Sequence, residues 1–130
     1  MTIFDKILQQ EIPSYKVYED EDTYAFLDIA QATKGHTLVI SKHPGEDFLT
    51  MDPLHYQQVM NVSQTLAQDI CHKLGANGCN LLTNAQPIAG QTVMKFHVHI
   101  LPRYDEEDGL TIAFHPRKET TIEETHQKLI

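Results

Sequence analysis

Two histidines, His97 and His99, stand two positions apart in the largely apolar stretch KFHVHILPR, residues 95–103. Successive side chains of a β-strand point to opposite faces, so the two imidazoles would share one face and lie roughly 7 Å apart along the strand. At that spacing they can address different atoms of one ligand group. The pair alone leaves three interpretations open: a catalytic site, a metal site, and two half-exposed histidines on the solvated face of a strand.

The loop before this stretch favours the catalytic interpretation. Its sequence AGQTV, residues 89–93, offers a glycine, an amide donor and a hydroxyl beside the histidine face. A glycine-containing turn of this kind can aim backbone N–H groups at an anion. A neutral imidazole next to such a turn indicates nucleophilic chemistry at phosphorus. The metal interpretation is weaker, because no Cys or His spacing nearby supplies the third ligand that two histidines need.

The elements that must position these residues follow from hydrophobic period and from capping residues. Asp52 is a good N-cap, Pro53 a good first helical residue and Gly75 a stop signal, so they bound one long helix. Its expected apolar stripe is Leu54, Val59, Val62, Leu66, Ile70 and Leu74. We expect a short N-terminal helix that Pro13 ends, two strands around the acidic turn 19–22, further strands at 36–41 and 79–84, a histidine strand that includes Lys95, and a terminal helix begun by a Thr121–Glu124 capping box. This order predicts an α+β fold with a mainly antiparallel sheet of about five strands.

Length and composition indicate an ordinary globular protein. The chain has 130 residues, 41% of them hydrophobic, which suits one domain. A net charge of −8 repels phosphate backbones, so we expect no nucleic acid partner. No long apolar run and no signal-like N-terminus is present, so we expect no membrane partner and a cytoplasmic location. Cys71 and Cys79 fit no disulfide framework or zinc motif and are expected to be buried.

The stretch GQTVMKFHVHILPRY, residues 90–104, resembles the signature of the histidine triad (HIT) hydrolases and transferases of nucleotides. That signature reads His-φ-His-φ-His-φ-φ, with φ hydrophobic, after a Gly-Gln-Ser/Thr-Val turn. Lys95 stands where the signature has its first histidine. The stretches IPSYKVYEDEDTYAFLDI, TKGHTLVISK and NLLTNAQPIAGQ are also similar to the family, so the resemblance covers about residues 2–104. It implies a HIT-like domain over residues 1–130 with a C-terminal tail, 105–130, that matches nothing family-wide.

The resemblance implies hydrolysis of a nucleoside phosphoramidate or a dinucleoside polyphosphate. His97 would attack the α-phosphorus, His99 would assist the leaving group, and His36 would lie against the phosphate. A covalent nucleotidyl-histidine would form, and water would then release the nucleoside monophosphate. The implied substrate-binding residues are Phe26, Leu27 and Ile29 as walls of the base site, Asp28 for the ribose hydroxyls, and Asn84, Gly90, Gln91, Thr92 and Val93 around the phosphate. It also implies a purine nucleotide substrate, no cofactor and a homodimer.

Departures from the family leave its activity open. Zinc-bearing relatives carry four ligands at positions that read Thr2, Asp5, Pro44 and Lys95 here, so we expect no metal. Retained activity is one outcome, since the carbonyl of Lys95 could orient His97 as well as that of a histidine. Loss of activity is the opposite outcome. The Lys95 ammonium would then cross into the phosphate pocket, and the protein would be a non-catalytic purine-nucleotide-binding module. A structural domain with incidental histidines is a third interpretation.

Overall fold

The computed structural model describes residues 1–118 and 121–130, and within them five strands form one antiparallel sheet in the order β1-β2-β3-β5-β4. The elements are α1 (Ile3–Leu8), β1 (Lys16–Glu19), β2 (Thr23–Leu27), β3 (Thr37–Ser41), α2 (Pro53–Leu74), β4 (Gly78–Leu82), η1 (Pro87–Ala89), β5 (His97–Arg103) and α3 (Ile122–Leu129). The expected α+β fold, with its antiparallel sheet, one long helix and short terminal helices, is confirmed.

Helix α2 begins and ends where the capping residues predict. The side chain of Asp52 accepts a hydrogen bond from the backbone N–H of Leu54 at 2.8 Å, and Pro53 is the first helical residue. Gly75 closes the helix in the left-handed conformation, with φ 70°. The short helix α1 ends sooner than expected, at Leu8 rather than near Pro13. Gln10, with φ 62°, already turns the chain away from the helical path.

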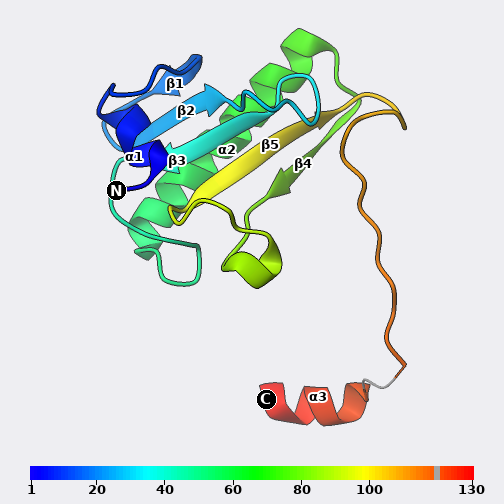
Figure 1. Ribbon diagram of the computed structural model, residues 1–130. Helices are drawn as coiled ribbons and strands as arrows, with labels where there is room; N and C mark the ends of the chain where they lie inside the picture. The colour runs from blue at the N-terminus through cyan, green and yellow to red at the C-terminus, as the bar shows by residue number, and fades with distance from the viewer. Residues whose placement is uncertain (119–120) are drawn as a thin grey trace.

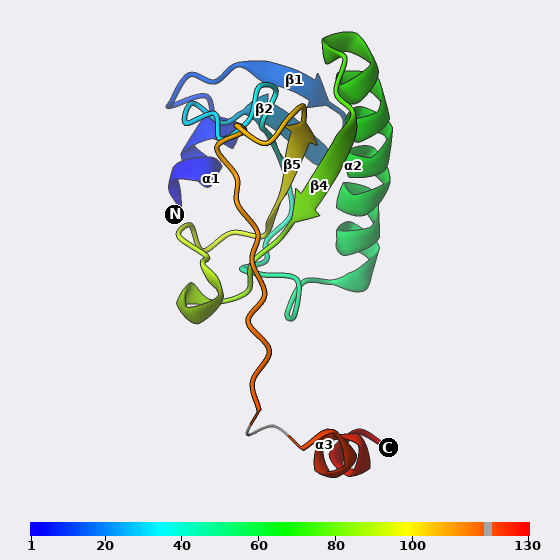
Figure 2. The same ribbon diagram turned by 90° about the vertical axis from the view of Figure 1, so that its right-hand side faces the viewer.

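The two helices lie on opposite faces of the sheet (Figures 1 and 2). One face packs on α2 and forms the larger core cluster of Ala25, Val39, Met51, Val59, Leu66, Ile70, Phe96, Val98 and Ile100. The other face packs on α1 and forms a second cluster of Phe4, Ile7, Phe26, Leu38 and Ile40. Strand β5 contributes Val98 and Ile100 to the first cluster. His97 and His99 alternate with them and therefore point to the other face, toward α1.

Some sequence-based expectations about burial are wrong. Leu54 and Leu74 are 60% and 37% exposed, because α2 packs on the sheet through its middle and its ends project beyond it. Cys79 is exposed and Cys71 only half-buried, since Cys79 lies on β4 at the edge of the sheet. The histidine strand begins at His97, so Lys95 lies in the bend before it.

The C-terminal tail runs away from the sheet (Figure 1). Helix α3 forms as expected after Thr121, but Thr121 makes no side-chain capping bond, so the capping box is not seen. Its residues are all exposed. Within 1–118 and 121–130, no helix is long and apolar enough to cross a membrane.

Phe96 provides the test of this packing. It is 1% exposed and belongs to the cluster under α2, so truncation leaves a cavity in a close-packed core. Phe96→Ala is expected to lower the free energy of unfolding by about 3–5 kcal/mol, measured by urea denaturation. Phe114→Ala, at a tail residue that is 89% exposed, is the matched control and should change it by less than about 0.5 kcal/mol. Equal losses in both variants would contradict the assigned core.

Candidate active site

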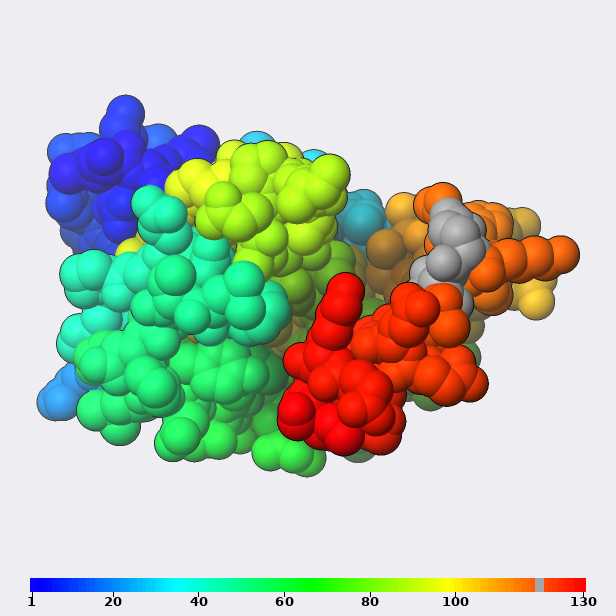
Figure 3. Space-filling model, turned by 90° about the horizontal axis from the view of Figure 1, so that it is seen from below, coloured from blue at the N-terminus to red at the C-terminus, as the bar shows by residue number. Residues whose placement is uncertain are grey.

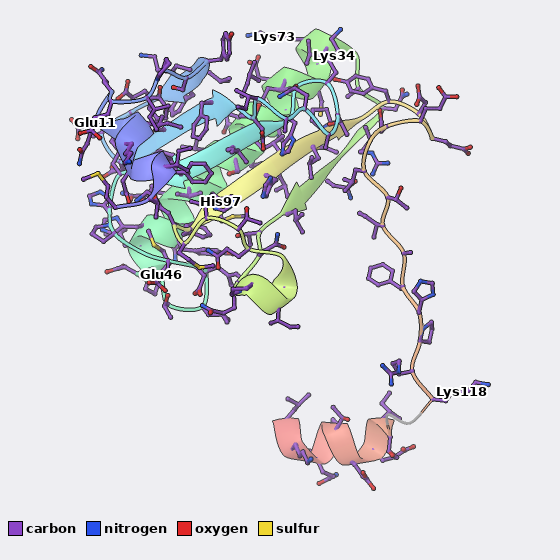
Figure 4. The ribbon with its side chains drawn as sticks, in the orientation of Figure 1. Glu11, Lys34, Glu46, Lys73, His97 and Lys118 are labelled. Carbon is purple, nitrogen blue, oxygen red and sulfur yellow. The ribbon has the colours of Figure 1, made fainter. Side chains whose placement is uncertain are left out.

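A cavity of about 300 Å³ opens between α1, the end of β2 and the start of β5. Its lining is Ile3, Phe4, Ile7, Ile12, Pro13, Ser14, Phe26, Leu27, Asp28, Ile29, Leu38, Thr92, Val93, His97 and His99. Figure 4 places His97 at the start of β5, beside the loop that precedes the strand. The N-terminal segment and that loop lie on the same side of the molecule (Figure 3). The fold therefore gathers both motif histidines and most of the predicted substrate-binding residues around one opening.

The ring of His97 is held in one orientation. Its Nδ1 lies 2.6 Å from the backbone carbonyl oxygen of Lys95. A carbonyl can only accept, so Nδ1 carries the proton and Nε2 keeps the lone pair. The ring of Phe4 packs edge-on against the imidazole, with 5.0 Å between ring centroids. Burial lowers the pKa of His97, and the Lys95 carbonyl and the Asp28 charge oppose that shift only in part.

His36 and His99 form a hydrogen-bonded pair beside His97. The backbone N–H of Ala32 donates to Nδ1 of His36 at 3.3 Å, so the neutral His36 ring carries its proton on Nε2. The Nε2–H of His36 donates to Nδ1 of His99 at 2.9 Å. A neutral His99 therefore carries its own proton on Nε2, which can act as a donor. Burial, followed by the neighbouring His97 and His36, lowers the pKa of His99 to about 4. Burial also lowers the pKa of His36.

Asp28 is held at the end of β2 next to this pair. Its Oδ1 accepts a hydrogen bond from the backbone N–H of Ala30 at 2.8 Å, and its own N–H donates to the carbonyl of His36 at 3.0 Å. Its Oδ2 lies 3.7 Å from Nε2 of His36. The carboxylate is therefore anchored through one oxygen, and the other faces the histidine pair. Asp28 also lines the cavity, where a hydroxyl-bearing ligand could donate to it.

The remaining predicted residues lie in the loop between β4 and β5. Gln91 is 3% exposed, and its side chain joins this loop to the segment between β3 and α2. Oε1 accepts from the N–H of Gln86, and Nε2 donates to the carbonyl of Val93 in the loop and to that of Glu46 in the other segment. Gly90 has φ 99° and lies so close to Asn84 that a Cβ would approach the Asn84 amide to 3.3 Å. Asn84, Gly90 and Gln91 are not among the cavity-lining residues.

The N-terminal helix contributes to the site in a way that its sequence did not predict. Ile3, Phe4 and Ile7 line the cavity, and none of them was among the predicted site residues. The signal was present in Phe4, because an aromatic residue on a two-turn helix must pack against something outside that helix. Nothing local in the sequence says that this partner is His97.

The positions that the family resemblance assigns to zinc ligands do not fit that ion here. Lys95 Nζ lies 3.2 Å from Asp5 Oδ1, so an ammonium occupies the place next to the carboxylate that a cation would take. A lysine ammonium has no lone pair to give a metal. The ammonium is also held away from the histidine cavity, because Lys95 lines a different hollow together with Asp5 and Lys42. It does not cross into the space in front of His97.

Two further groups in the described part of the chain bring three metal-binding atoms within 4.8 Å of one another: Asp22, His43 and His55, and Asp28, His36 and His99. The rings of His43 and His55 are stacked, 3.6 Å apart and 12° from parallel. Their in-plane lone pairs therefore lie in separate planes and do not converge on one ion. In the second group a hydrogen bond of 2.9 Å joins Nε2 of His36 to Nδ1 of His99, so these two atoms already serve each other as donor and acceptor.

The lowered pKa of His99 predicts a loss of stability in acid. An unfolded imidazole takes up a proton near pH 6.5, whereas folded His99 resists protonation until about pH 4. Proton uptake by the unfolded state alone lowers the free energy of unfolding. This loss is absent above about pH 6.5 and grows as the pH falls toward 4. Urea unfolding of His99→Asn at pH 7.5 and pH 5.0 should show a smaller decrease in the free energy of unfolding than the parent protein. His115→Asn, at an exposed tail histidine, should leave the decrease unchanged; equal decreases in all three proteins would contradict the assignment.

Comparison with known proteins agrees with this fold. A family model for the HIT domain matches residues 9–106. Protein hit of Bacillus subtilis is 45% identical over 107 residues, covering 82% of this chain and 74% of that protein. An adenosine 5′-monophosphoramidase of Saccharomyces cerevisiae is 34% identical over 131 residues, covering 98% and 80%. The crystal structure of a HIT family protein from Bacillus anthracis has a TM-score of 0.90 at 41% identity, covering 98% of this chain and 90% of that one. The chain thus belongs to the HIT family.

Proposed function

We propose that this protein hydrolyses a nucleoside phosphoramidate or a dinucleoside polyphosphate at the α-phosphorus through a covalent nucleotidyl-His97. The observation that carries the proposal is the bond of 2.6 Å between His97 Nδ1 and the Lys95 carbonyl, which leaves Nε2 with its lone pair in a ring that lines the cavity. Burial keeps that ring neutral, as a nucleophile must be. The monophosphoramidase activity of the yeast relative supports the phosphoramidate class.

The reaction proceeds in two displacements. Nε2 of His97 attacks the α-phosphorus and forms a P–N bond, while the bond to the leaving amine or phosphate breaks. The Nδ1 proton stays on the ring, where the Lys95 carbonyl stabilises the positive charge of the phosphorylated imidazole. Water then attacks the same phosphorus, the P–N bond breaks with Nε2 restored, and the proton that the water loses passes to the neighbouring neutral His99. An amine leaving group needs one proton in the first step.

His99 is the proposed source of that proton. It neighbours His97, with 5.0 Å between ring centroids, and its Nε2 is the donor end of the chain from Ala32 through His36. In the free protein its pKa is lowered to about 4, but the negative charge of a bound phosphate raises it. Substrate binding would therefore charge His99 at the moment when an acid is required.

The rest of the cavity suits a purine nucleotide. Phe26, Leu27 and Ile29 offer apolar walls for the base, and the anchored Asp28 carboxylate can accept from ribose hydroxyls. Thr92 and Val93 line the cavity at the phosphate end, and we propose that Asn84, Gly90 and Gln91 fix the shape of the turn behind them. Because the whole protein carries a charge of −8, these local donors must hold the phosphate.

We propose that Lys95 takes the position of the first triad histidine and that activity is retained. The group that orients His97 is the backbone carbonyl of residue 95, which lysine and histidine share. The ammonium is bound to Asp5 and stays outside the cavity. Neither contact involves Nε2 of His97 or His99, the groups that act in the displacement at phosphorus.

A cytoplasmic homodimer completes the proposal. Strand β4 is an edge strand, and its Leu81 and Leu82 are 45% and 41% exposed, so it presents apolar side chains and unpaired backbone groups to a second copy. Light scattering of the purified protein tests this state, and a mass of one chain would contradict it.

Adenosine 5′-phosphoramidate is the first substrate to test. We expect AMP release, and an adenylyl adduct on His97 in samples quenched early by alkaline denaturation and analysed by mass spectrometry. His97→Ala should abolish both, because the variant lacks the Nε2 lone pair that attacks the α-phosphorus. His99→Ala should lower kcat by roughly 10²–10⁴-fold, the usual effect of losing an acid–base group. His115→Ala, in the exposed tail, is the control and should match the parent protein.

Two results would contradict the proposal. Turnover that survives His97→Ala would exclude the nucleophile. An absence of turnover and adduct, together with a rise in melting temperature on adding AMP, would favour a nucleotide-binding module without catalysis.

A further inference from the structure

Lys95 is a buried lysine with two oxygen partners. Its side chain is 6% exposed, and Nζ lies 3.2 Å from Asp5 Oδ1 and 3.4 Å from the carbonyl oxygen of His43. Burying an ammonium is costly unless its partners are fixed in place. Since this lysine comes from an irregular segment and Asp5 from a separate helix, the pair joins two elements that are 90 positions apart in the chain.

Hydrogen bonds at the first turn of α1 orient the Asp5 carboxylate toward Lys95. The backbone N–H and the hydroxyl of Thr2 both donate to Asp5 Oδ2 at 2.9 Å, which leaves Oδ1 for Lys95. Burial alone would raise the pKa of Asp5, but the bonds from Thr2 and the charge of Lys95 outweigh it, so the pKa is lowered. The carboxylate is ionised at neutral pH and cannot rotate freely. It is a fixed anchor for the lysine.

Each segment joined by the pair also contacts His97. Phe4, the residue before Asp5, packs edge-on against the imidazole with 5.0 Å between centroids. The backbone carbonyl of Lys95 accepts a hydrogen bond from Nδ1–H of His97 at 2.6 Å. The side chain of His97 is therefore held from two directions, by groups whose relative position depends on the bond between Asp5 and Lys95.

From these contacts we infer that the Asp5–Lys95 ion pair positions the nucleophile: it fixes α1 against the segment before β5 and so sets the tautomer and direction of the His97 ring. The inference rests on the proposed function in calling His97 the nucleophile. Lys95 and Asp5 touch no reacting atom and are positioning residues. A displacement of the ring by about 1 Å can cost as much as 10²-fold in rate, so such an anchor matters to catalysis.

The test compares Lys95→Met, Asp5→Asn and the double variant with the parent protein. Methionine keeps much of the length of lysine without its charge, and asparagine keeps the size of aspartate and can still accept from Thr2. Lys73→Met is the matched control, because Lys73 pairs with Asp69 at 2.9 Å on the exposed side of α2. Circular dichroism and melting temperature identify the variants that are folded, and either single variant suffices for the test if the other does not fold.

The first readout needs no enzyme activity. Long-range ¹⁵N–¹H spectra at pH 7.5 report the tautomer of His97 directly. We expect one tautomer, protonated at Nδ1, in the parent protein and in Lys73→Met. Both tautomers should appear in Lys95→Met and Asp5→Asn. A single Nδ1–H tautomer in every folded variant would overturn the inference, whether or not the protein turns over a nucleotide.

The second readout separates positioning from binding. With adenosine 5′-phosphoramidate, kcat should fall roughly 10- to 100-fold in each single variant while KM changes by less than about threefold. The double variant should lose no more than Lys95→Met alone, because both changes break one interaction. Losses that multiply in the double variant, or a change confined to KM, would overturn the inference. A parent protein without turnover would refute the proposed function and leave the tautomer result to decide this one.

Discussion

The structure depends on the alternation of side chains along β5. Residues on one face, among them Val98 and Ile100, are almost completely buried under α2, and this fixes the register of the strand. A shift by one residue would turn both histidines into the core and the apolar side chains toward the cavity. The hydrophobic burial that stabilises the sheet is therefore the same constraint that points His97 and His99 at the cavity. Stability and site geometry share one cause.

Desolvation gives this site its chemical character. The three imidazoles of the cavity region all have lowered pKa values, with burial as the largest cause in each case. Three neutral rings in an acidic protein form a cluster that can exchange protons without carrying permanent positive charge. A site of this kind binds an anion through directed N–H groups, and the arriving charge alters its protonation state. A cluster of lysines at the same place would bind the anion more tightly and have no neutral nucleophile to offer it.

Much of the fold follows from local sequence, and much of the site does not. Asp52, Pro53 and Gly75 define α2 because capping depends on neighbours along the chain. The hairpin around residues 19–22 and the histidine face follow from two-residue alternation. The bond between Lys95 and Asp5 and the contact of Phe4 with His97 join residues more than 85 positions apart, and periodicity carries no information about such pairs. The role of each predicted site residue stays a prediction.

The tail beyond the sheet has an evolutionary consequence. All described side chains from position 111 onward are exposed, and α3, with eight residues, is too short to be stable as an isolated helix in water. Substitutions there leave the core and its packing energy untouched. Selection for folding thus exerts almost no pressure on this segment, whereas it constrains nearly every position of β3 and β5. Substitutions should therefore accumulate in the tail before they accumulate in the sheet. A tail whose sequence stayed constant would be conserved for contacts with another molecule.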